Sequence, residues 1–206
     1  MGLTTRKGLK AAVTATAMGA AVLLSAGQAH AATGVTANSA FINVNAAAGK
    51  ANRITVTASG TNVVITDTGD TVTAGAGCTQ RTANSVTCPA GTRTLIIQTG
   101  DLNDSVLLQA SLRASIYGQT GNDQLHALGT GQRAVLSGAE GDDSLYGGSA
   151  DDDIVGGTGN DTMVGGAGND RITAQDGLGG NDYSDGDLGR DVCVSDVGDR
   201  EFSCDD

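Results

Sequence analysis

A fixed period of nine residues runs through the second half of this chain. From Gly138 to Thr173 the sequence reads GAEGDDSLY GGSADDDIV GGTGNDTMV GGAGNDRIT. Each unit carries an aspartate at the same place, at positions 143, 152, 161 and 170, and an aliphatic residue two positions later. One short repeat cannot bury its apolar side chain alone, so repeats of this kind stack on their neighbours and share an elongated core. The period therefore predicts a repeat fold that is stacked from small units.

The composition agrees with a stacked repeat. Glycine accounts for 32 of the 206 residues, aromatic residues for 2%, and tryptophan is absent. A conventional core needs more large side chains than this. High glycine content with few aromatic residues fits either disorder or a repeat fold, and the periodicity favours the repeat fold.

The acidic residues are concentrated in the repeat half. Of the 23 Asp and Glu residues, 21 follow position 100, and only five arginines accompany them, which leaves residues 101–206 with a net charge of −16. Such a block repels itself and compacts only when something neutralises it. It also repels nucleic acids and anionic membranes, so we exclude both as direct partners. The natural partner of clustered carboxylates is a hard cation.

The nonapeptides match the pattern G-G-x-G-x-D-x-U-x, in which U is a large aliphatic residue, and they resemble the haemolysin-type (RTX) calcium-binding repeats. The match runs from about Gly100 to Val194 and is strongest from Gly118 to Thr173. The resemblance implies a right-handed parallel β-roll that folds when calcium binds outside the cell. In such a roll two nonapeptides make one turn, so loops on one edge recur about every 18 residues.

The resemblance assigns calcium binding to the aspartates and glycines of the loops. These are Asp123, Asp143, Asp152, Asp161, Asp170, Asp182 and Asp191, with Gly118, Gly121, Gly138, Gly141, Gly147, Gly156, Gly159, Gly165 and Gly168. Calcium takes about six to eight oxygen ligands, more than one loop can supply. Two stacked loops can reach that number, because each adds a carboxylate and the carbonyls of a glycine-rich turn.

The spacing of the aspartates predicts which loops pair. Early steps of 19 and 20 residues span a full turn, later steps of 9 place loops on both edges, and a step of 12 marks an insertion near Ala174–Gly177. We expect a roll that is one-sided before Gly138 and two-sided after it, with about five calcium ions. The predicted pairs are Asp123–Asp143, Asp143–Asp161 and Asp161–Asp182 on one edge and Asp152–Asp170 and Asp170–Asp191 on the other, with Asp104–Asp123 as a weaker sixth candidate. The predicted interior column is Leu125, Leu145, Ile154, Met163 and Ile172.

The first half of the chain differs from the repeats. Residues 1–31 combine a basic start, an apolar run and an Ala-His-Ala site, which is typical of a secretory signal peptide. Residues 32–98 alternate in period two between turn clusters, which predicts short β-strands that cap or lead into the roll of residues 99–206. We expect the first residues, 32–39, to be mobile.

Four cysteines occur, in two local pairs. Four cysteines allow three pairings, and the simplest joins Cys78 to Cys88, across a hairpin or loop, and Cys193 to Cys204, as a cap on the C-terminal end. An exported chain meets an oxidising compartment, which favours disulfides over free thiols.

These features favour a secreted, extracellular calcium-binding protein with a structural or interaction role. An adhesion module for a cell surface or a glycan is an alternative, although the sequence shows no aromatic platform and leaves the partner unknown. A polysaccharide-modifying enzyme is the least favoured hypothesis. Residues 32–206 hold one histidine, His126, which we interpret as a surface strand residue, and no Ser/His/Asp or HExxH arrangement. We expect neither catalysis nor membrane insertion.

Overall fold

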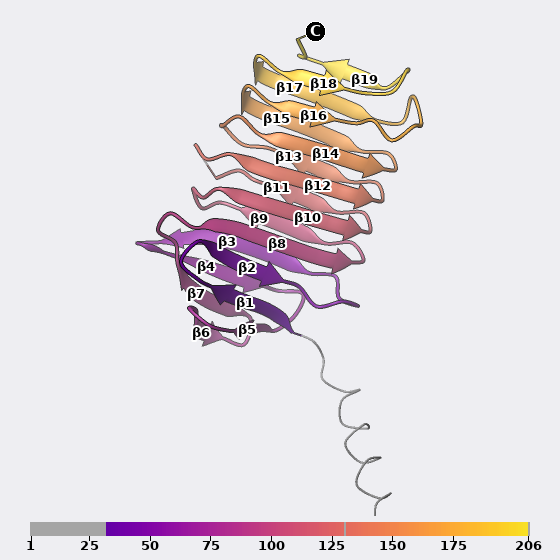
Figure 1. Ribbon diagram of the computed structural model, residues 1–206. Helices are drawn as coiled ribbons and strands as arrows, with labels where there is room; N and C mark the ends of the chain where they lie inside the picture. Colours follow the sequence, from indigo (N-terminus) through magenta and orange to yellow (C-terminus); the bar gives the residue numbers. More distant parts are fainter. Residues whose placement is uncertain (1–31, 130, 206) are drawn as a thin grey trace, which may run out of the picture. The chain divides into compact units, whose positions relative to one another are not determined.

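The computed structural model describes residues 32–129 and 131–205 (Figure 1). These residues form strands, turns and bends and contain no helix. In particular, the described part of the chain has no helix long and apolar enough to cross a membrane. The predicted signal peptide lies outside the described residues.

The repeat half is a parallel β-solenoid with two sheets (Figure 1). Each turn adds one strand to each sheet, and neighbouring turns pair in parallel. The successive pairs are β8 (Thr94–Asp101) with β9 (Ser105–Leu108), β10 (Ala114–Thr120) with β11 (Gln124–His126), β12 (Ala134–Glu140) with β13 (Ser144–Tyr146), β14 (Asp153–Thr158) with β15 (Thr162–Gly168), β16 (Arg171–Thr173) with β17 (Tyr183–Gly189), and β18 (Val192–Val194) with β19 (Arg200–Phe202). This architecture confirms the predicted all-β roll.

The core consists of aliphatic columns that run along the roll. All five residues predicted for the interior are fully buried, namely Leu125, Leu145, Ile154, Met163 and Ile172. Each lies in register with its counterpart one turn away, as Leu145 does with Met163 in one sheet and Ile154 with Ile172 in the other. Burying one such side chain contributes about 1.5–3 kcal/mol, so the columns stabilise the stack without large aromatic residues.

The strands predicted for the first half are present. They are β1 (Thr33–Ala37), β2 (Phe41–Asn45), β3 (Arg53–Ser59), β4 (Asn62–Asp67), β5 (Val72–Ala74), β6 (Thr79–Thr82) and β7 (Ser85–Pro89). The expectation of a mobile start is wrong. Strand β1 lies between β2 and β5, and Val35 is fully buried, so apolar packing and pairing on both sides fix this segment.

The first half continues the two sheets of the roll. Strand β2 pairs in parallel with β8, and β3 pairs in parallel with β9. Beyond them the pairing is antiparallel in β1–β2 of one sheet and in β3–β4–β7–β6 of the other, while β1 pairs in parallel with β5. Residues from Ala32 onward form one compact unit, so the sheets have no break between the two halves.

Both predicted disulfides are present. Cys78 is bonded to Cys88 on β7, and Cys193 on β18 is bonded to Cys204 in the C-terminal tail. Closing a loop of 10 or 11 residues contributes roughly 2–3 kcal/mol on the chain-entropy estimate. The disulfides therefore secure one segment near each end of the folded unit.

Candidate metal sites at the two edges of the roll

The aspartates of the repeats form two ladders. The first edge, defined by the loops that follow β8, β10, β12, β14 and β16, carries Asp104, Asp123, Asp143, Asp161 and Asp182. The second edge, defined by the loops that follow β13, β15 and β17, carries Asp152, Asp170 and Asp191. The loops that follow β9 and β11 contain no aspartate. The roll is thus one-sided at first and two-sided later, as the spacing predicted.

Within each ladder, a carboxylate reaches back to the previous turn. The Oδ1 atom of Asp143 accepts the N–H of Asp123 at 2.7 Å, and that of Asp161 accepts the N–H of Asp143 at 2.9 Å. The same bond joins each of the other predicted pairs, Asp161–Asp182, Asp152–Asp170 and Asp170–Asp191, at 2.7–2.8 Å. All five predicted pairs therefore lie in direct contact.

The second carboxylate oxygen is left without a donor. Among the described residues, Oδ2 is buried and accepts no hydrogen bond in Asp104, Asp123, Asp143, Asp161, Asp170, Asp182 and Asp191. A buried ionised oxygen without a partner is strongly unfavourable, and the burial of these oxygens calls for a positive charge beside them. Asp152 differs, because its Oδ2 accepts the N–H of Gly148 at 2.7 Å.

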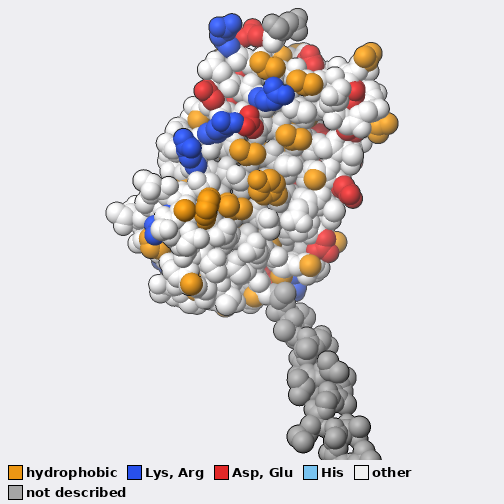
Figure 2. Space-filling view, in the orientation of Figure 1, with side chains coloured by type: hydrophobic (Ala, Val, Ile, Leu, Met, Phe, Trp, Pro, Cys, Tyr) orange, Lys and Arg blue, Asp and Glu red, His pale blue; other side chains and the backbone are white. Residues whose placement is uncertain are grey.

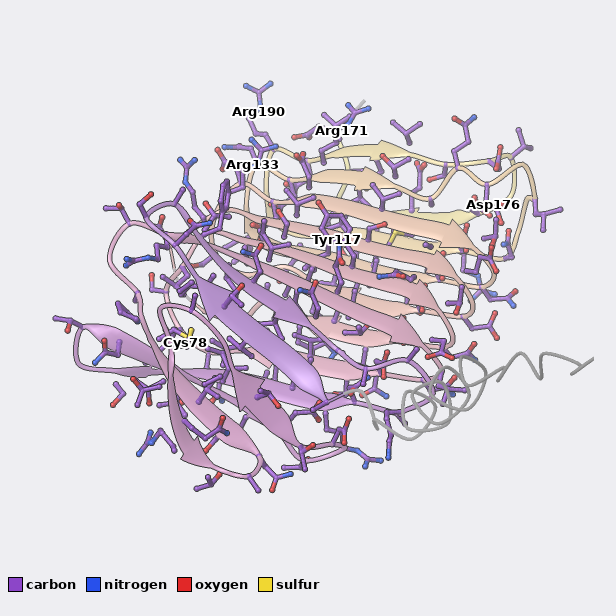
Figure 3. All side chains as sticks on the ribbon, turned by 60° about the horizontal axis from the view of Figure 1, so that its bottom comes forward. Cys78, Tyr117, Arg133, Arg171, Asp176 and Arg190 are labelled. Atoms are coloured by element: carbon purple, nitrogen blue, oxygen red, sulfur yellow. A yellow bond between two sulfur atoms is a disulfide. The ribbon has the colours of Figure 1, made fainter. Side chains whose placement is uncertain are left out.

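Among the described residues no arginine forms an ion pair with a ladder aspartate, although the charge of Arg133 partly offsets the burial that raises the pKa of Asp152. Arg133, Arg171 and Arg190 lie together, far from Asp176 in the insertion, as Figure 3 shows. Figure 2 shows most of the visible basic side chains on the upper part of this face, with acidic side chains among them. Among the described residues the one ion pair joins Arg133 to Asp153, which is not a ladder aspartate. The protein therefore leaves the ladders to be neutralised by something else.

The first glycine of each loop leaves a space lined with oxygen atoms. A Cβ on Gly118 would stand 2.2 Å from Asp123 Oδ2 and 2.9 Å from the carbonyl oxygen of Gly138 in the next turn. On the second edge, a Cβ on Gly165 would stand 2.4 Å from Asp170 Oδ2 and 2.9 Å from the Gly186 carbonyl oxygen. All four oxygen atoms are closer than a carbon atom can approach, so a side chain is excluded from this space, whereas calcium binds oxygen at roughly 2.3–2.6 Å. We call this space the cradle of the loop, and glycine keeps it open.

The other loop glycines serve the backbone. Gly141 adopts φ 131°, and a Cβ there would stand 2.1 Å from the carbonyl oxygen of Gly121 one turn earlier. Gly159 repeats this arrangement, with φ 134° and a distance of 2.1 Å to the Gly141 carbonyl oxygen. Only glycine tolerates both the left-handed conformation and such close stacking.

Burial raises the pKa of the ladder aspartates. It brings the pKa of Asp123, Asp143 and Asp170 to about 6 and that of Asp161 to about 7, even though each carboxylate accepts a backbone N–H. Neighbouring carboxylates add to the increase by like-charge repulsion. The ionised ladder is therefore unfavourable on its own, which is the property expected of a site built around a cation.

Two residues at the start of the first edge were missed by the sequence analysis. Asn52 stands one turn before Asp104: its N–H donates to Asp104 Oδ1 at 2.6 Å, and its side-chain amide donates to the Lys50 and Thr99 carbonyl oxygens. Thr99 lies in register with Gly118, so its side chain fills the position of a cradle, and its hydroxyl donates to the Gly118 carbonyl oxygen at 2.9 Å. The Thr99 side chain thus occupies the Asp104–Asp123 gap, the weaker sixth candidate.

The end of the first edge was also missed. Asp199 continues the ladder beyond Asp182, and its Oδ1 accepts the N–H groups of Gly180, Asn181 and Asp182 at 2.7–3.3 Å. The insertion has opened this loop, because a Cβ on Gly177 would meet nothing within 4 Å. The Asp182–Asp199 gap therefore has no cradle.

Carbonyl groups must supply most of any coordination shell here. No three His, Cys, Asp or Glu side chains of the described residues gather into a metal-holding cluster. This agrees with loops that each contribute a single carboxylate. His126 lies elsewhere, on the outer face of β11, with its ring 4.7 Å from that of Tyr146 and its Nε2 atom buried without a partner among the described residues.

A comparison with protein families identifies the repeats. The model of the RTX calcium-binding nonapeptide repeat (4 copies) matches residues 128–163 and 155–193. The chain therefore carries RTX calcium-binding repeats, and six of the seven predicted site aspartates, all except Asp123, lie within the matched residues. A search of curated proteins and a search of solved structures each give no match. The β-roll and the repeats together describe a calcium-binding repeat protein.

Proposed function

We propose that the roll binds calcium in the gaps between successive loops and that this binding drives its folding. The observation that carries the proposal is the cradle, where a buried carboxylate oxygen without a donor and a carbonyl of the next turn face the same space. A cation there neutralises the aspartates and joins two turns. The residues that would hold it are the aspartates and first-position glycines of consecutive loops.

The proposed sites are the five predicted gaps, Asp123–Asp143, Asp143–Asp161, Asp161–Asp182, Asp152–Asp170 and Asp170–Asp191. The Asp104–Asp123 gap is left out, since Thr99 fills it. Because the loop aspartates of one edge repel one another when ionised, removal of the ion should expand or unfold the repeat half. Binding energy at the cradles is then folding energy for the roll.

The experiment is a calcium titration of residues 32–206, followed by circular dichroism and by native mass spectrometry. We expect a cooperative gain of β-structure at millimolar or lower calcium and about five bound ions. Magnesium at the same concentration serves as a control, because it demands a more regular shell at shorter distances. An identical spectrum and mass with calcium and with chelator would refute the proposal.

We further propose a secreted protein with a structural or interaction role. Two disulfides fit an oxidising extracellular environment, and calcium is abundant there. RTX repeats are typically structural, which supports a non-enzymatic role. Fractionation of a culture that expresses the full chain tests the location: the proposal requires the protein in the medium or at the outer surface, and a reduced protein inside the cell would contradict it.

A further inference from the structure

The C-terminal tail continues the second edge after the last repeat has ended. In the second-edge ladder, the residue after each aspartate donates its N–H to the aspartate carbonyl of the previous turn. Arg171 donates to Asp152 O at 2.9 Å, and Val192 donates to Asp170 O at 2.9 Å. In the tail, Asp205 donates to Asp191 O at 2.6 Å. The tail thus forms one more partial turn, in which Cys204 takes the place of an aspartate.

This partial turn completes a cradle. At the cradle of Gly147, the carbonyl oxygen of the next turn belongs to Gly165 and lies 2.2 Å from the position that a Cβ on Gly147 would take. Over Gly186 it comes from Ser203, whose carbonyl oxygen would stand 2.3 Å from such a Cβ, with Asp191 Oδ2 at 2.6 Å. Ser203 adopts φ 51°, a left-handed conformation that is unusual for serine and that accompanies this orientation of its carbonyl.

The carboxylate at this cradle is as unsatisfied as those inside the ladder. Asp191 is 1% exposed, and its Oδ2 accepts no hydrogen bond from any described residue. Within residues 32–129 and 131–205, no basic side chain forms an ion pair with Asp191. A buried carboxylate oxygen without a donor, beside a carbonyl of the next turn, is the arrangement also found at the Gly118 and Gly165 cradles.

We propose that Asp191 and the tail carbonyl of Ser203 form an additional calcium site that the Cys193–Cys204 disulfide holds together. The inference rests on the proposed function, and it adds a site that lies outside the nonapeptide pattern. Cys193 faces the interior in register with Ile172, so its bond to Cys204 fixes the tail against the last turn. Reduction of this disulfide releases the tail and, with it, one wall of the site.

The site should be the weakest of the series. A gap inside the ladder contains Oδ2 of one aspartate and Oδ1 of the next, whereas this gap contains one carboxylate, because a cysteine occupies the next position. Fewer charged ligands lower calcium affinity, and we expect at least a tenfold difference from the internal sites.

The test counts the ions bound to residues 32–206 at saturating calcium by native mass spectrometry. Gly186→Ala places a methyl group in the cradle and leaves the disulfide intact; Gly186 has no left-handed φ that alanine would strain. The matched control is Gly34→Ala, where the nearest atom to a new Cβ is 4.0 Å away. The second variant, C193S/C204S, frees the tail, and its control is C78S/C88S.

We expect C193S/C204S to bind one ion fewer than the parent and both controls to bind the parent number. Gly186→Ala should lose one or two ions, because the displaced Asp191 also reaches into the Asp170–Asp191 gap through Oδ1. An unchanged count in Gly186→Ala overturns the site, and an unchanged count in C193S/C204S overturns its dependence on the disulfide. If C193S/C204S loses several ions because the last turns fray, Gly186→Ala alone decides. A parent chain that binds no calcium refutes the proposed function itself, whereas a parent with about five ions and variants that match it refute only this inference.

Discussion

Closing one cradle inside the ladder tests the calcium sites most directly. Gly138→Ala is suited to this, because Gly138 has no left-handed φ and the change adds a single methyl group. Its Cβ would stand 2.0 Å from Asp143 Oδ2 and 2.6 Å from Asp143 Cγ. The carboxylate must move by more than about 1 Å to reach a normal contact distance, and it then leaves the space where the ion is coordinated.

The expected magnitude follows from ligand linkage. Above saturation, each ion that binds only the folded state raises the free energy of unfolding by about 1.4 kcal/mol for every tenfold increase in calcium. Five ions give a slope of about 7 kcal/mol per tenfold increase. Asp143 contributes Oδ2 to the Asp143–Asp161 gap and Oδ1 to the Asp123–Asp143 gap. Gly138→Ala should therefore remove one or two ions. The slope should fall by about 1.4–2.8 kcal/mol per tenfold increase.

The assay is urea unfolding at several calcium concentrations, followed by circular dichroism, with Gly34→Ala as the matched control. The control should keep the parent slope, since its new methyl group meets no close neighbour. The free energy of unfolding is plotted against the logarithm of the calcium concentration. If the plot of the variant runs parallel to that of the parent and lower by a constant amount, the methyl group causes only a steric cost. In that case the cradle does not hold an ion, and the argument from the orphan carboxylate oxygens fails.

Three further outcomes are expected. Thr99→Gly opens a cradle below Asp104 and should raise the number of bound ions by one in native mass spectrometry, whereas Thr99→Ser, which keeps the hydroxyl, should not. In chelator, the folded ladder should be more stable at pH 4 than at pH 7.5. Burial raises the pKa of Asp161 from an ordinary 3.8 to about 7 in the folded state. The protonated Asp161 therefore stabilises the fold fully below the unfolded-state pKa, and this contribution is lost as the pH rises through the folded-state pKa. Thermal unfolding in chelator at both pH values checks this, and a rise in stability with pH would contradict it. Met163→Ala should cost about 2–5 kcal/mol in urea unfolding with calcium present, because a fully buried side chain leaves a cavity, and a cost below 1 kcal/mol would mean that the column is loosely packed.

The parts of the structure that repeat could be predicted from the sequence. A period of nine fixes both the strand that carries Leu145 and the loop that carries Asp143, and the doubling of that period fixes which loops touch. The pairing Asp143–Asp161 therefore followed from counting residues, and its hydrogen bond is present at 2.9 Å. The local cysteine pairs were predicted for a similar reason, since short separations close small loops.

The parts that break the period could not be found in this way. Asn52 stacks on Asp104 although 52 residues separate them, because β4 to β7 intervene between two adjacent turns of the sheets. No spacing rule connects positions so far apart. Thr99 occupies the place of a loop glycine next to the weaker candidate Asp104–Asp123, and the role of its hydroxyl depends on the Gly118 carbonyl of the next turn. Ser203 acts through its backbone, which a side-chain pattern does not record.

Asn52, Thr99 and Ser203 each lie at an end of a ladder, and they share one physical reason for this position. A stack of identical calcium loops would leave an uncoordinated carboxylate or carbonyl at each end, and buried polar groups of that kind are costly. At the first turn, the side-chain amide of Asn52 and the hydroxyl of Thr99 donate to the carbonyl oxygens of Thr99 and Gly118, while Asp104 Oδ2 stays buried without a donor. At the last turn of the second edge, no donor reaches Asp191 Oδ2, and the tail supplies a carbonyl instead. The carbonyl oxygens of the first turn are therefore bonded by protein donors, whereas the last turn of the second edge depends on calcium, so the C-terminal turns should be the first to open when calcium falls.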